Sequence, residues 1–325
     1  MNKISSISIK IIRSILGNQN AKYQIPYKGY LDLCGQSAND YIYDFLSATY
    51  NKGKMICKFG TVELANLVAY HFEQHKWTKE YIKDILNYNA SYNFSSTIKI
   101  LCNNAGFFPC DISLGEDFYK RTIRDIKEID ILASYIYQEK YFKEELCNIK
   151  KRVDLDGYYA PFMWEKPWTR ILKGKKVLIV HPFTESIESQ YYNNREHIWE
   201  DSMVLPEFKE LITLKAVQSI AGEKTQFKTW FDALHYMENE ISKLDFDIAL
   251  IGCGAYGMCL AAHVKRMGKI GIHLAGWTQF LFGIYGNRWL KNQPEYAHFI
   301  NKYWIRPNEN ELPKNAEKVE GGCYW

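Results

Sequence analysis

Residues 245–276 constrain the fold more than any other part of the chain, and they read DFDIALIGCGAYGMCLAAHVKRMGKIGIHLAG. An apolar strand is followed by Gly252, Gly254 and Gly257 in the spacing G-x-G-x-x-G, then by a helical pattern and a second apolar strand. Strands joined through a helix of roughly ten residues or more predict a parallel sheet. Glycines at a strand-to-helix turn let backbone amides approach a ligand, and the helix N-terminus favours an anion.

The same alternation recurs elsewhere in the chain. Residues 54–60 (KMICKFG) form an apolar run ending in glycine, and the helical pattern TVELANLVAYHF follows directly. A second buried strand is predicted at 175–183 and a helix around 226–244. Residues 117–149 carry apolar positions at helical intervals, which predicts a helical scaffold. Together these elements predict a doubly wound, mostly parallel, Rossmann-like α/β sheet with helical insertions.

Length and composition fit one large domain. The chain has 325 residues, 47% of them hydrophobic and 24% charged, and no apolar run is long enough for a transmembrane helix. Because no repeat or Pro/Gly/Ser-rich linker interrupts residues 20–325, we expect a single domain there, with a sub-boundary near 170 as the alternative. Residues 1–19 form a basic amphipathic segment. Two interpretations of that segment stay open: a helix docked on the core, or a helix lying in a membrane interface.

Charge and cysteine content narrow the functional classes. A formal charge of +4 without a basic stripe argues against a nucleic-acid partner, but it is compatible with small anionic substrates or an anionic membrane surface. The eight cysteines include no CxxC pair, which is typical of reduced thiols rather than of a disulfide framework or a zinc site. We therefore expect a cytoplasmic protein, with the inner face of the cell membrane as a further expected location.

The glycine turn does not by itself predict a nicotinamide cofactor. An NAD enzyme of the simple kind places an acid about 20 residues beyond the glycines, where it holds the adenosine ribose. Residues 248–294 contain no Asp or Glu. The missing acid disfavours NAD, and the acid-free stretch favours an anionic ligand such as a diphosphate.

Several stretches resemble a known enzyme family. They are FGTVEL at 59–64, NNAGFFP at 103–109, IGCGAYGMCLAAHVKRMGKIGIHLAGWTQFLFGIYGNRW at 251–289, and the closing EGGCYW. In these stretches the chain resembles bacterial glycosyltransferases of the GT-D type and their relatives in surface-polysaccharide clusters, over most of residues 50–325. The resemblance implies one Rossmann-like domain, a nucleotide-sugar donor, and a D-x-E motif after an early strand that binds a divalent metal and the donor diphosphate.

The function that this resemblance implies is transfer of a hexose-type sugar from a nucleoside-diphosphate sugar to a growing cell-surface glycan. That glycan would be a capsule, an O-antigen or a glycoprotein glycan, with a lipid-linked acceptor among the expected forms. Two alternatives stay open: an NAD(P)-dependent sugar-modifying oxidoreductase, and a non-catalytic nucleotide-sugar-binding protein of the same fold.

The chain departs from the family motif at Thr61, where the family has an acid, while Glu63 matches the second acid. One carboxylate plus a hydroxyl binds Mg²⁺ or Mn²⁺ more weakly than two carboxylates do. Glu63 is therefore the expected metal ligand of a weak site. The alternative for Glu63 is a first-turn helix acid that interacts with the helix dipole.

Further candidates follow the predicted strand ends. Glu185 and Glu188 follow the strand that ends at His181, and with Glu63 they are the candidate catalytic carboxylates, because sugar transfer can use a base within reach of the acceptor hydroxyl. The alternative for His181 is a buried histidine with its hydrogen bonds satisfied. The candidate donor-binding residues are Gly60, Thr61, His181, Gly252, Gly254, Gly257, Gly276, Gln279 and Arg288.

Overall fold

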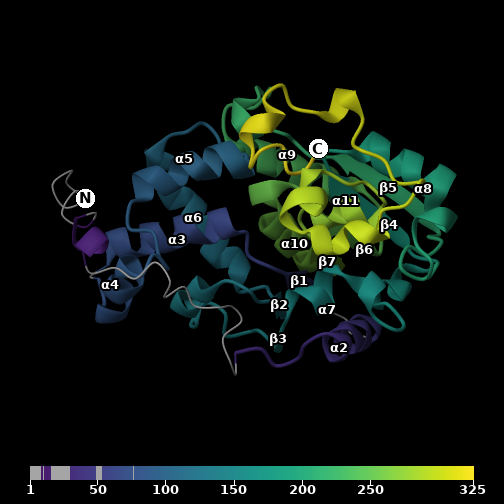
Figure 1. Cartoon of the computed structure of the whole chain (residues 1–325), viewed down its shortest axis with the longest axis horizontal. Helices are drawn as coiled ribbons and strands as arrows, with labels where there is room; N and C mark the ends of the chain where they lie inside the picture. The colour runs from purple at the N-terminus through teal and green to yellow at the C-terminus, as the bar shows by residue number, and fades with distance from the viewer. Residues whose placement is uncertain (1–8, 10, 16–29, 49–52, 76) are drawn as a thin grey trace.

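The computed structural model describes residues 9, 11–15, 30–48, 53–75 and 77–325. Its strands are β1 (Lys54–Cys57), β2 (Ile131–Ala133), β3 (Lys151–Val153), β4 (Lys176–His181), β5 (Glu210–Lys215), β6 (Ile248–Ile251) and β7 (Ile270–His273). They form one seven-stranded sheet in the order β3-β2-β1-β7-β6-β4-β5, and every pair in it is parallel (Figure 1). The predicted Rossmann-like α/β class is confirmed. Strands from both sides of residue 170 belong to this one sheet.

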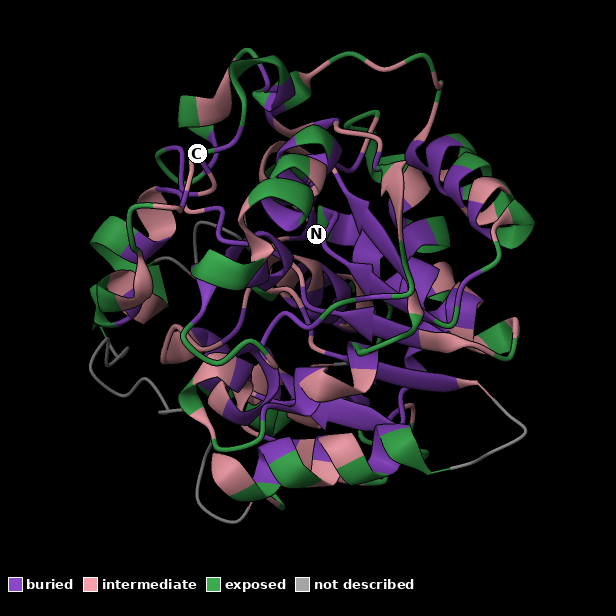
Figure 2. Cartoon of the chain, turned by 90° about the vertical axis from the view of Figure 1, so that its right-hand side faces the viewer, coloured by how far each residue is buried: buried purple, intermediate pink, exposed green. Residues whose placement is uncertain are grey.

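Helices cover both faces of the sheet. The core on one face includes α3 (Thr61–Gln74), α4 (Lys79–Leu86), α5 (Phe94–Ala105), α6 (Gly115–Ile126), α9 (Trp230–Lys243) and α10 (Gly257–Arg266). The core on the other face includes α2 (Gln36–Ser47), α7 (Leu155–Tyr159), α8 (Thr184–Ile198) and α11 (Trp277–Leu281). Figure 2 shows the buried strands between helices whose outer surfaces are exposed.

Short helical turns complete the connections. They are the 3-10 helices η1 (Ile112–Leu114), η2 (Tyr137–Phe142), η3 (Pro161–Met163), η4 (Trp168–Leu172), η5 (Ile220–Gly222), η6 (Gly254–Tyr256), η8 (Pro294–Phe299), η9 (Glu309–Glu311) and η10 (Ala316–Lys318), and the π-helical turn η7 (Arg288–Asn292).

The alternation of side chains along β4 shows how the two cores form. Leu178 and Val180 pack into the core that contains α10, whereas Val177 and Ile179 pack into the core that contains α8. Successive side chains of a strand point to opposite faces, so an apolar run can fill both cores at once. This is why KKVLIVHPF reads as a continuous apolar strand.

One predicted element is wrong in part. A helical scaffold was predicted for residues 117–149. The long helix in this segment, α6, ends at Ile126, and the strand β2 follows it. Ile129 and Leu132 are both fully buried, the latter in the strand, although their spacing also fits a helix. A short strand buried on both faces lacks the polar alternation that would distinguish it from a buried helix. The polar stretch after residue 183 contains the fifteen-residue helix α8.

Most of the basic amphipathic segment 1–19 lies outside the described residues, which include only 9 and 11–15 of it. The guanidinium of Arg13 donates hydrogen bonds to the carbonyl oxygens of Ile85 (2.6 Å) and Ala90 (3.0 Å). It also lies 4.2 Å from the ring centroid of Tyr88. These contacts hold the helical turn at 11–15 against the end of α4 and the residues that follow it.

No helix in the described ranges has both the length and the apolar character needed to cross a membrane.

Candidate functional site

The carboxyl ends of four neighbouring strands open into one pocket of about 390 Å³. β1, β7, β6 and β4 stand side by side in the sheet. A residue that follows each of them closely lines the pocket, namely Gly60, Gly276, Gly252 and Pro182. Open α/β sheets bind their ligands in this position, beyond the carboxyl ends of the strands.

The pocket brings together most of the predicted site residues. Those that line it are Gly60, Thr61, Glu63, His181, Gly252, Gly254, Gly276, Gln279 and Arg288. They come from turns that are far apart in the chain, which is what the predicted parallel topology requires. Gly257, Glu185 and Glu188 do not line it.

The two predicted carboxylates of α8 lie outside the pocket. Glu185 is exposed, with a carboxylate oxygen 3.4 Å from the ammonium of Lys215 on β5, and it accepts a hydrogen bond of 2.7 Å from the Asn310 side chain. Glu188 accepts a hydrogen bond from the hydroxyl of Thr213, also on β5. Because α8 directs both side chains to the β5 side, their position gives no support for either as the base of a reaction in this pocket.

Gly257 has a packing role. It is the first residue of α10, and a Cβ added there would overlap the imidazole of His273 at the end of β7. The missing side chain therefore lets the helix approach the strand, which is a known use of the third glycine in this kind of turn. Because Gly257 does not line the pocket, its position gives no support for the predicted contact with the donor.

The turn after β6 requires glycine at Gly252 and Gly254. A Cβ on Gly252 would overlap the carbonyl oxygen of Ala275, and Gly254 has a φ of +56°, with an added Cβ only 2.6 Å from the carbonyl oxygen of Ala105. The turn leads through η6 into α10, whose first turn contains no acidic residue. The positive end of the α10 dipole is therefore not neutralised within its own helix, which favours an anion near this turn.

The turn after β1 has the opposite character. Glu63 is in the first turn of α3, and a Cβ on Gly60 would overlap its carboxylate, so the side chain folds back over the start of the helix. Glu63 is half-buried, and desolvation raises the pKa of its carboxyl above the ordinary value. The hydroxyl of the neighbouring Thr61 lies 3.1 Å from the Tyr135 hydroxyl.

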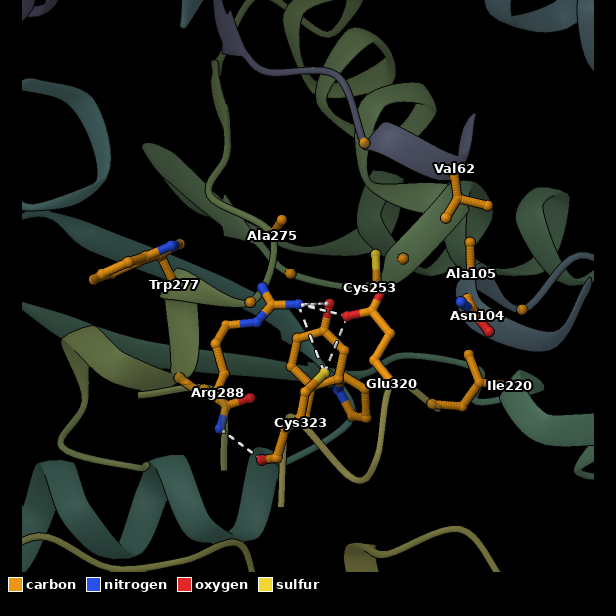
Figure 3. A pocket seen from close by; sticks show the side chains of 18 of the residues that line it. Val62, Asn104, Ala105, Ile220, Cys253, Ala275, Trp277, Arg288, Glu320 and Cys323 are labelled. Atoms are coloured by element: carbon orange, nitrogen blue, oxygen red, sulfur yellow. Dashed lines mark hydrogen bonds and ion pairs between the residues drawn. The ribbon is translucent and has the colours of Figure 1, made fainter. Parts of the chain in front are cut away.

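Two cationic side chains, Lys58 and Arg288, line the pocket. Lys58 follows β1 directly, and its ammonium lies 5.2 Å from the ring centroid of Tyr135. Arg288 begins η7; its Nη2 donates to the Tyr324 hydroxyl (3.0 Å) and lies 3.2 Å from a carboxylate oxygen of Glu320 (Figure 3). The guanidinium carbon also lies 4.4 Å from the Tyr324 ring centroid. These contacts fix the orientation of the guanidinium.

Both histidines of the pocket are neutral. Burial lowers the pKa of His181 and of His273 to about 3. His181 accepts a hydrogen bond of 3.0 Å from the Phe183 N–H at its Nδ1. This assigns the proton to Nε2, so His181 offers the pocket an uncharged hydrogen-bond donor. The structure thus combines the two interpretations of His181, since it is buried, bonded at Nδ1, and still lines the pocket.

Several lining side chains carry a buried polar atom without a hydrogen-bond partner among the described residues. They are Gln218 (Nε2), His273 (Nε2), Gln279 (Oε1) and Trp325 (Nε1). A buried polar atom without a partner costs free energy. A polar ligand in the pocket can supply the missing partners.

Some pocket residues were not predicted from the sequence. Lys58 and the C-terminal wall of Glu320, Cys323, Tyr324 and Trp325 all line the cavity. The wall comes from EGGCYW, a stretch that carries part of the family resemblance but has no function assigned to it. Lys58 could have been predicted as a pocket residue from the sequence, because it lies between the end of a predicted strand and a glycine turn.

A stacked pair of aromatic rings forms part of the pocket wall. The rings of Trp277 and Tyr159 stack with centroids 4.0 Å apart and planes inclined by 8°, and both residues line the cavity. Trp277 was noted in the sequence only as part of GWTQFLFGIYGNRW. Because Trp277 and Tyr159 are 4% and 7% exposed, the pair belongs to the core and presents little of its surface to the cavity.

The donor set around Glu63 does not form a metal site by itself. Within the described part of the chain there is no group of three or more His, Cys, Asp and Glu side chains that could hold a metal ion. Glu63 and Thr61 fit a hard cation only as partial ligands. Mg²⁺ is often bound in this way, through one or two carboxylates and the phosphates of a substrate.

Comparison of the chain with protein-family models, curated proteins and solved structures found no match. The class that fold and site define is a Rossmann-like α/β protein with a ligand pocket at the carboxyl ends of its central strands.

Proposed function

We propose that this protein is a glycosyltransferase that binds a nucleoside-diphosphate sugar in the strand-end pocket and transfers the sugar to a growing cell-surface glycan. One observation carries the proposal: the glycine turn that leads into α10, a helix without an acid in its first turn, lines the same cavity as the cations Lys58 and Arg288, at the ends of four parallel strands. A phosphorylated ligand is the chemistry that this arrangement favours. The glycan acceptor is proposed from the family resemblance.

The pocket residues suit the parts of such a donor. The diphosphate would bind at the turn of Gly252 and Gly254, with the Arg288 guanidinium beside it. In sugar transfer, negative charge develops on the leaving diphosphate, and fixed cations and N–H donors lower the free energy of that charge. The stacked pair of Trp277 and Tyr159 would form an apolar part of the wall around the sugar or the base.

A divalent cation, when bound, would add further stabilisation of charge on the leaving diphosphate. Glu63 and Thr61 would hold Mn²⁺ or Mg²⁺ together with the donor phosphates. Metal dependence is therefore proposed to be weak, and Thr61→Asp should tighten Mn²⁺ binding measured in the presence of the nucleotide. Unchanged Mn²⁺ affinity in that variant would count against Glu63 as a ligand.

The exposed N-terminal turn gives the proposal a membrane component. Ile11, Ile12 and Ile15 are exposed on the described part of the segment, and a lipid-linked acceptor would place the enzyme at the inner face of the cell membrane. Deleting residues 3–16 should then release the protein from anionic vesicles at low salt while nucleotide affinity stays unchanged. Equal vesicle binding by both forms would contradict this location.

Calorimetric titration with UDP, GDP and NAD⁺, each with and without Mn²⁺, tests the proposed function. We expect a nucleoside diphosphate to bind and NAD⁺ to bind poorly, because no acid follows β7 to hold an adenosine ribose. Preferred binding of NAD⁺ would support the oxidoreductase alternative. Binding of a nucleotide sugar without any release of nucleoside diphosphate, with water or a glycan as acceptor, would support a non-catalytic binding protein.

A further inference from the structure

The pocket contains a second carboxylate that the sequence analysis did not assign. Among the residues that line it, Glu63 and Glu320 are the acids. Glu63 is folded over Gly60 at the start of α3, whereas Glu320 extends from the C-terminal wall. The other candidate bases, Glu185 and Glu188, lie outside the cavity. Glu320 is therefore the carboxylate on the solvent side of the pocket, where an acceptor would enter. Its side chain is 44% exposed.

The backbone around Glu320 is unusual for a glutamate. Its φ is +48°, and the glycines that follow, Gly321 and Gly322, have φ values of +68° and +74°. Glycine adopts such conformations easily, but a residue with a Cβ pays a conformational penalty there. Strain of this kind is concentrated at functional sites. Glycine would suit the backbone at position 320 better, yet the residue there is a glutamate.

Contacts on both sides of the turn hold the carboxylate in place. Before it, Val319 is fully buried. After it, the carbonyl oxygen of Cys323 accepts a hydrogen bond of 2.7 Å from the Arg288 N–H, and that of Trp325 accepts one of 3.0 Å from the Asn287 N–H. The Glu320 carboxylate is 3.2 Å from Arg288 Nη2 and accepts a hydrogen bond of 3.4 Å from the Cys323 thiol (Figure 3).

The guanidinium of Arg288 links this carboxylate to the proposed diphosphate site. Its Nη2 faces Glu320, while its Nη1 lies 3.3 Å from the place where a Cβ of Gly276 would be, at the end of β7. The remaining N–H groups of the fork are therefore directed toward the strand ends. Gln279 also lines the pocket; it is 1% exposed, and its Oε1 has no hydrogen-bond partner among the described residues. A polar ligand bound between Arg288 and Gln279 would therefore have Glu320 on its solvent side.

We propose that Glu320 is the general base of the transfer reaction. In this step the acceptor hydroxyl gives its proton to a carboxylate oxygen of Glu320, and the hydroxyl oxygen forms a bond to the anomeric carbon. The bond from that carbon to the donor phosphate oxygen breaks, and the nucleoside diphosphate leaves with the electron pair. A single displacement of this kind inverts the anomeric configuration. The inference rests on the proposed function of the same pocket.

Two variants test the role of Glu320. Glu320→Gln keeps the shape but removes the base, and Glu320→Gly removes the side chain from a position whose φ suits glycine. The matched control is Glu317→Gln, an exposed glutamate on the same segment. The readouts are calorimetric affinity for UDP and GDP, and release of nucleoside diphosphate from UDP-glucose, UDP-N-acetylglucosamine and GDP-mannose with water as acceptor.

We expect turnover to fall by about 10²- to 10⁴-fold in both Glu320 variants, the usual contribution of a positioned base, without a loss of nucleotide affinity. Added formate, a small external carboxylate, should restore part of the turnover of Glu320→Gly but not of a variant that has lost its fold. Turnover in Glu317→Gln should match the wild type. The released sugar should have the anomeric configuration opposite to that of the donor.

Three results would overturn the inference. Wild-type turnover in Glu320→Gln together with tighter nucleotide binding would show that Glu320 only neutralises Arg288. Retention of the anomeric configuration would exclude a single displacement. If the wild-type protein binds no nucleotide and turns over no nucleotide sugar, the proposed function itself fails, and the role of Glu320 fails with it.

Discussion

Two strand-turn-helix units face the same pocket, and they differ in the charge at the start of their helices. In the unit of β1 and α3, the first helical turn contains Glu63, whose carboxylate folds back over Gly60. In the unit of β6 and α10, no acid is present in the first turn, and Gly254 holds the backbone in a left-handed conformation. One helix N-terminus thus has an acidic side chain of its own, while the first turn of the other has none, which favours an external anion at the turn before it.

A glycine-rich motif is commonly taken to indicate both a tight turn and an anion site, and these two turns show that the two properties are separate. Glycine permits a tight turn, but the identity of the residues in the following helical turn decides whether an anion is attracted. The FGTVEL and GCGAYG turns look alike as strand-to-helix connections, and only the second is electrostatically suited to a diphosphate. The predictions below test this contrast.

The largest effect is expected on nucleotide affinity in Arg288→Ala, because this change removes the cation held between the C-terminal wall and the strand ends. A hydrogen bond between charged groups, such as the proposed one from Arg288 to the diphosphate, contributes about 1.5 to 3 kcal/mol to the free energy of binding. Calorimetry with UDP or GDP measures it. The control is Arg170→Ala, because Arg170 also stacks on a tyrosine, with its guanidinium carbon 3.4 Å from the Tyr43 ring centroid, but does not line the pocket. Equal affinities in the two variants would remove Arg288 from the donor site.

The next effect concerns pH and the neutral His181. Its pKa falls from 6.5 to about 3 on burial, so below pH 6.5 the unfolded chain binds a proton that the folded protein excludes. This contribution to stability is complete above pH 6.5 and is lost as the pH falls toward 3, by roughly 2 kcal/mol between pH 7 and 5. In His181→Asn, the side-chain carbonyl can still accept a hydrogen bond from the Phe183 N–H. The free energy of unfolding of this variant, measured with denaturant, should fall less between pH 7 and 5 than that of the wild type. An equal pH dependence in both proteins would show that His181 titrates normally.

A smaller effect on stability is expected for Gly254→Ala. The left-handed φ and the close Ala105 carbonyl both oppose a Cβ, and the conformational part alone is about 1 to 2 kcal/mol. Gly174→Ala is the matched control, because Gly174 has a φ of +68° with no atom within 4 Å of an added Cβ. Unfolding free energies should therefore fall more for Gly254→Ala than for Gly174→Ala. Equal losses would mean that the Ala105 contact relaxes without cost.

The smallest effect at neutral pH is expected for Glu63→Gln. As a first-turn acid, Glu63 contributes about 0.3 to 1 kcal/mol through the helix dipole, and its desolvation opposes this. Because its folded pKa is raised, the protonated form adds stability at low pH that is lost as the pH rises through the folded pKa. The wild type should therefore lose stability relative to Glu63→Gln as the pH increases. With Mn²⁺ present, turnover should fall in the same variant, because Glu63 is the proposed ligand of the metal. Unchanged turnover would leave Glu63 as a first-turn helix acid only.

The sequence predicted the centre of the sheet well, for a physical reason. β1, β4, β6 and β7 are apolar runs with a glycine or proline shortly beyond their ends, and they form where they were predicted. β2 and β3 have three residues each, too few for a period to be visible. Their position depends on partners such as Asp130, whose carboxylate accepts a hydrogen bond of 2.9 Å from the Met55 N–H. Contacts of this kind over 75 residues leave no local pattern.

The candidate site could be predicted only where it follows strand ends. The glycines, His181 and Glu63 were accessible because their turns are visible in the sequence. Glu320 was not, since its importance comes from a left-handed backbone and from Arg288, 32 residues earlier in the chain. Glu185 and Glu188 stand directly beyond a strand end, but the helix that begins there carries them to the outer side of β5.

The pairing of β1 with β7 places residues 54 and 270 beside each other in the middle of the sheet. Closing this pair requires a very long loop, and contacts between distant parts of a chain slow folding. During synthesis, the segment containing β1 to β3 leaves the ribosome long before its central neighbour exists, and an unpaired strand edge in such a species favours aggregation. The pocket lies across this pair of strands, so ligand binding requires β1 and β7 to be paired. Slow recovery of nucleotide binding after dilution from denaturant would report this pairing.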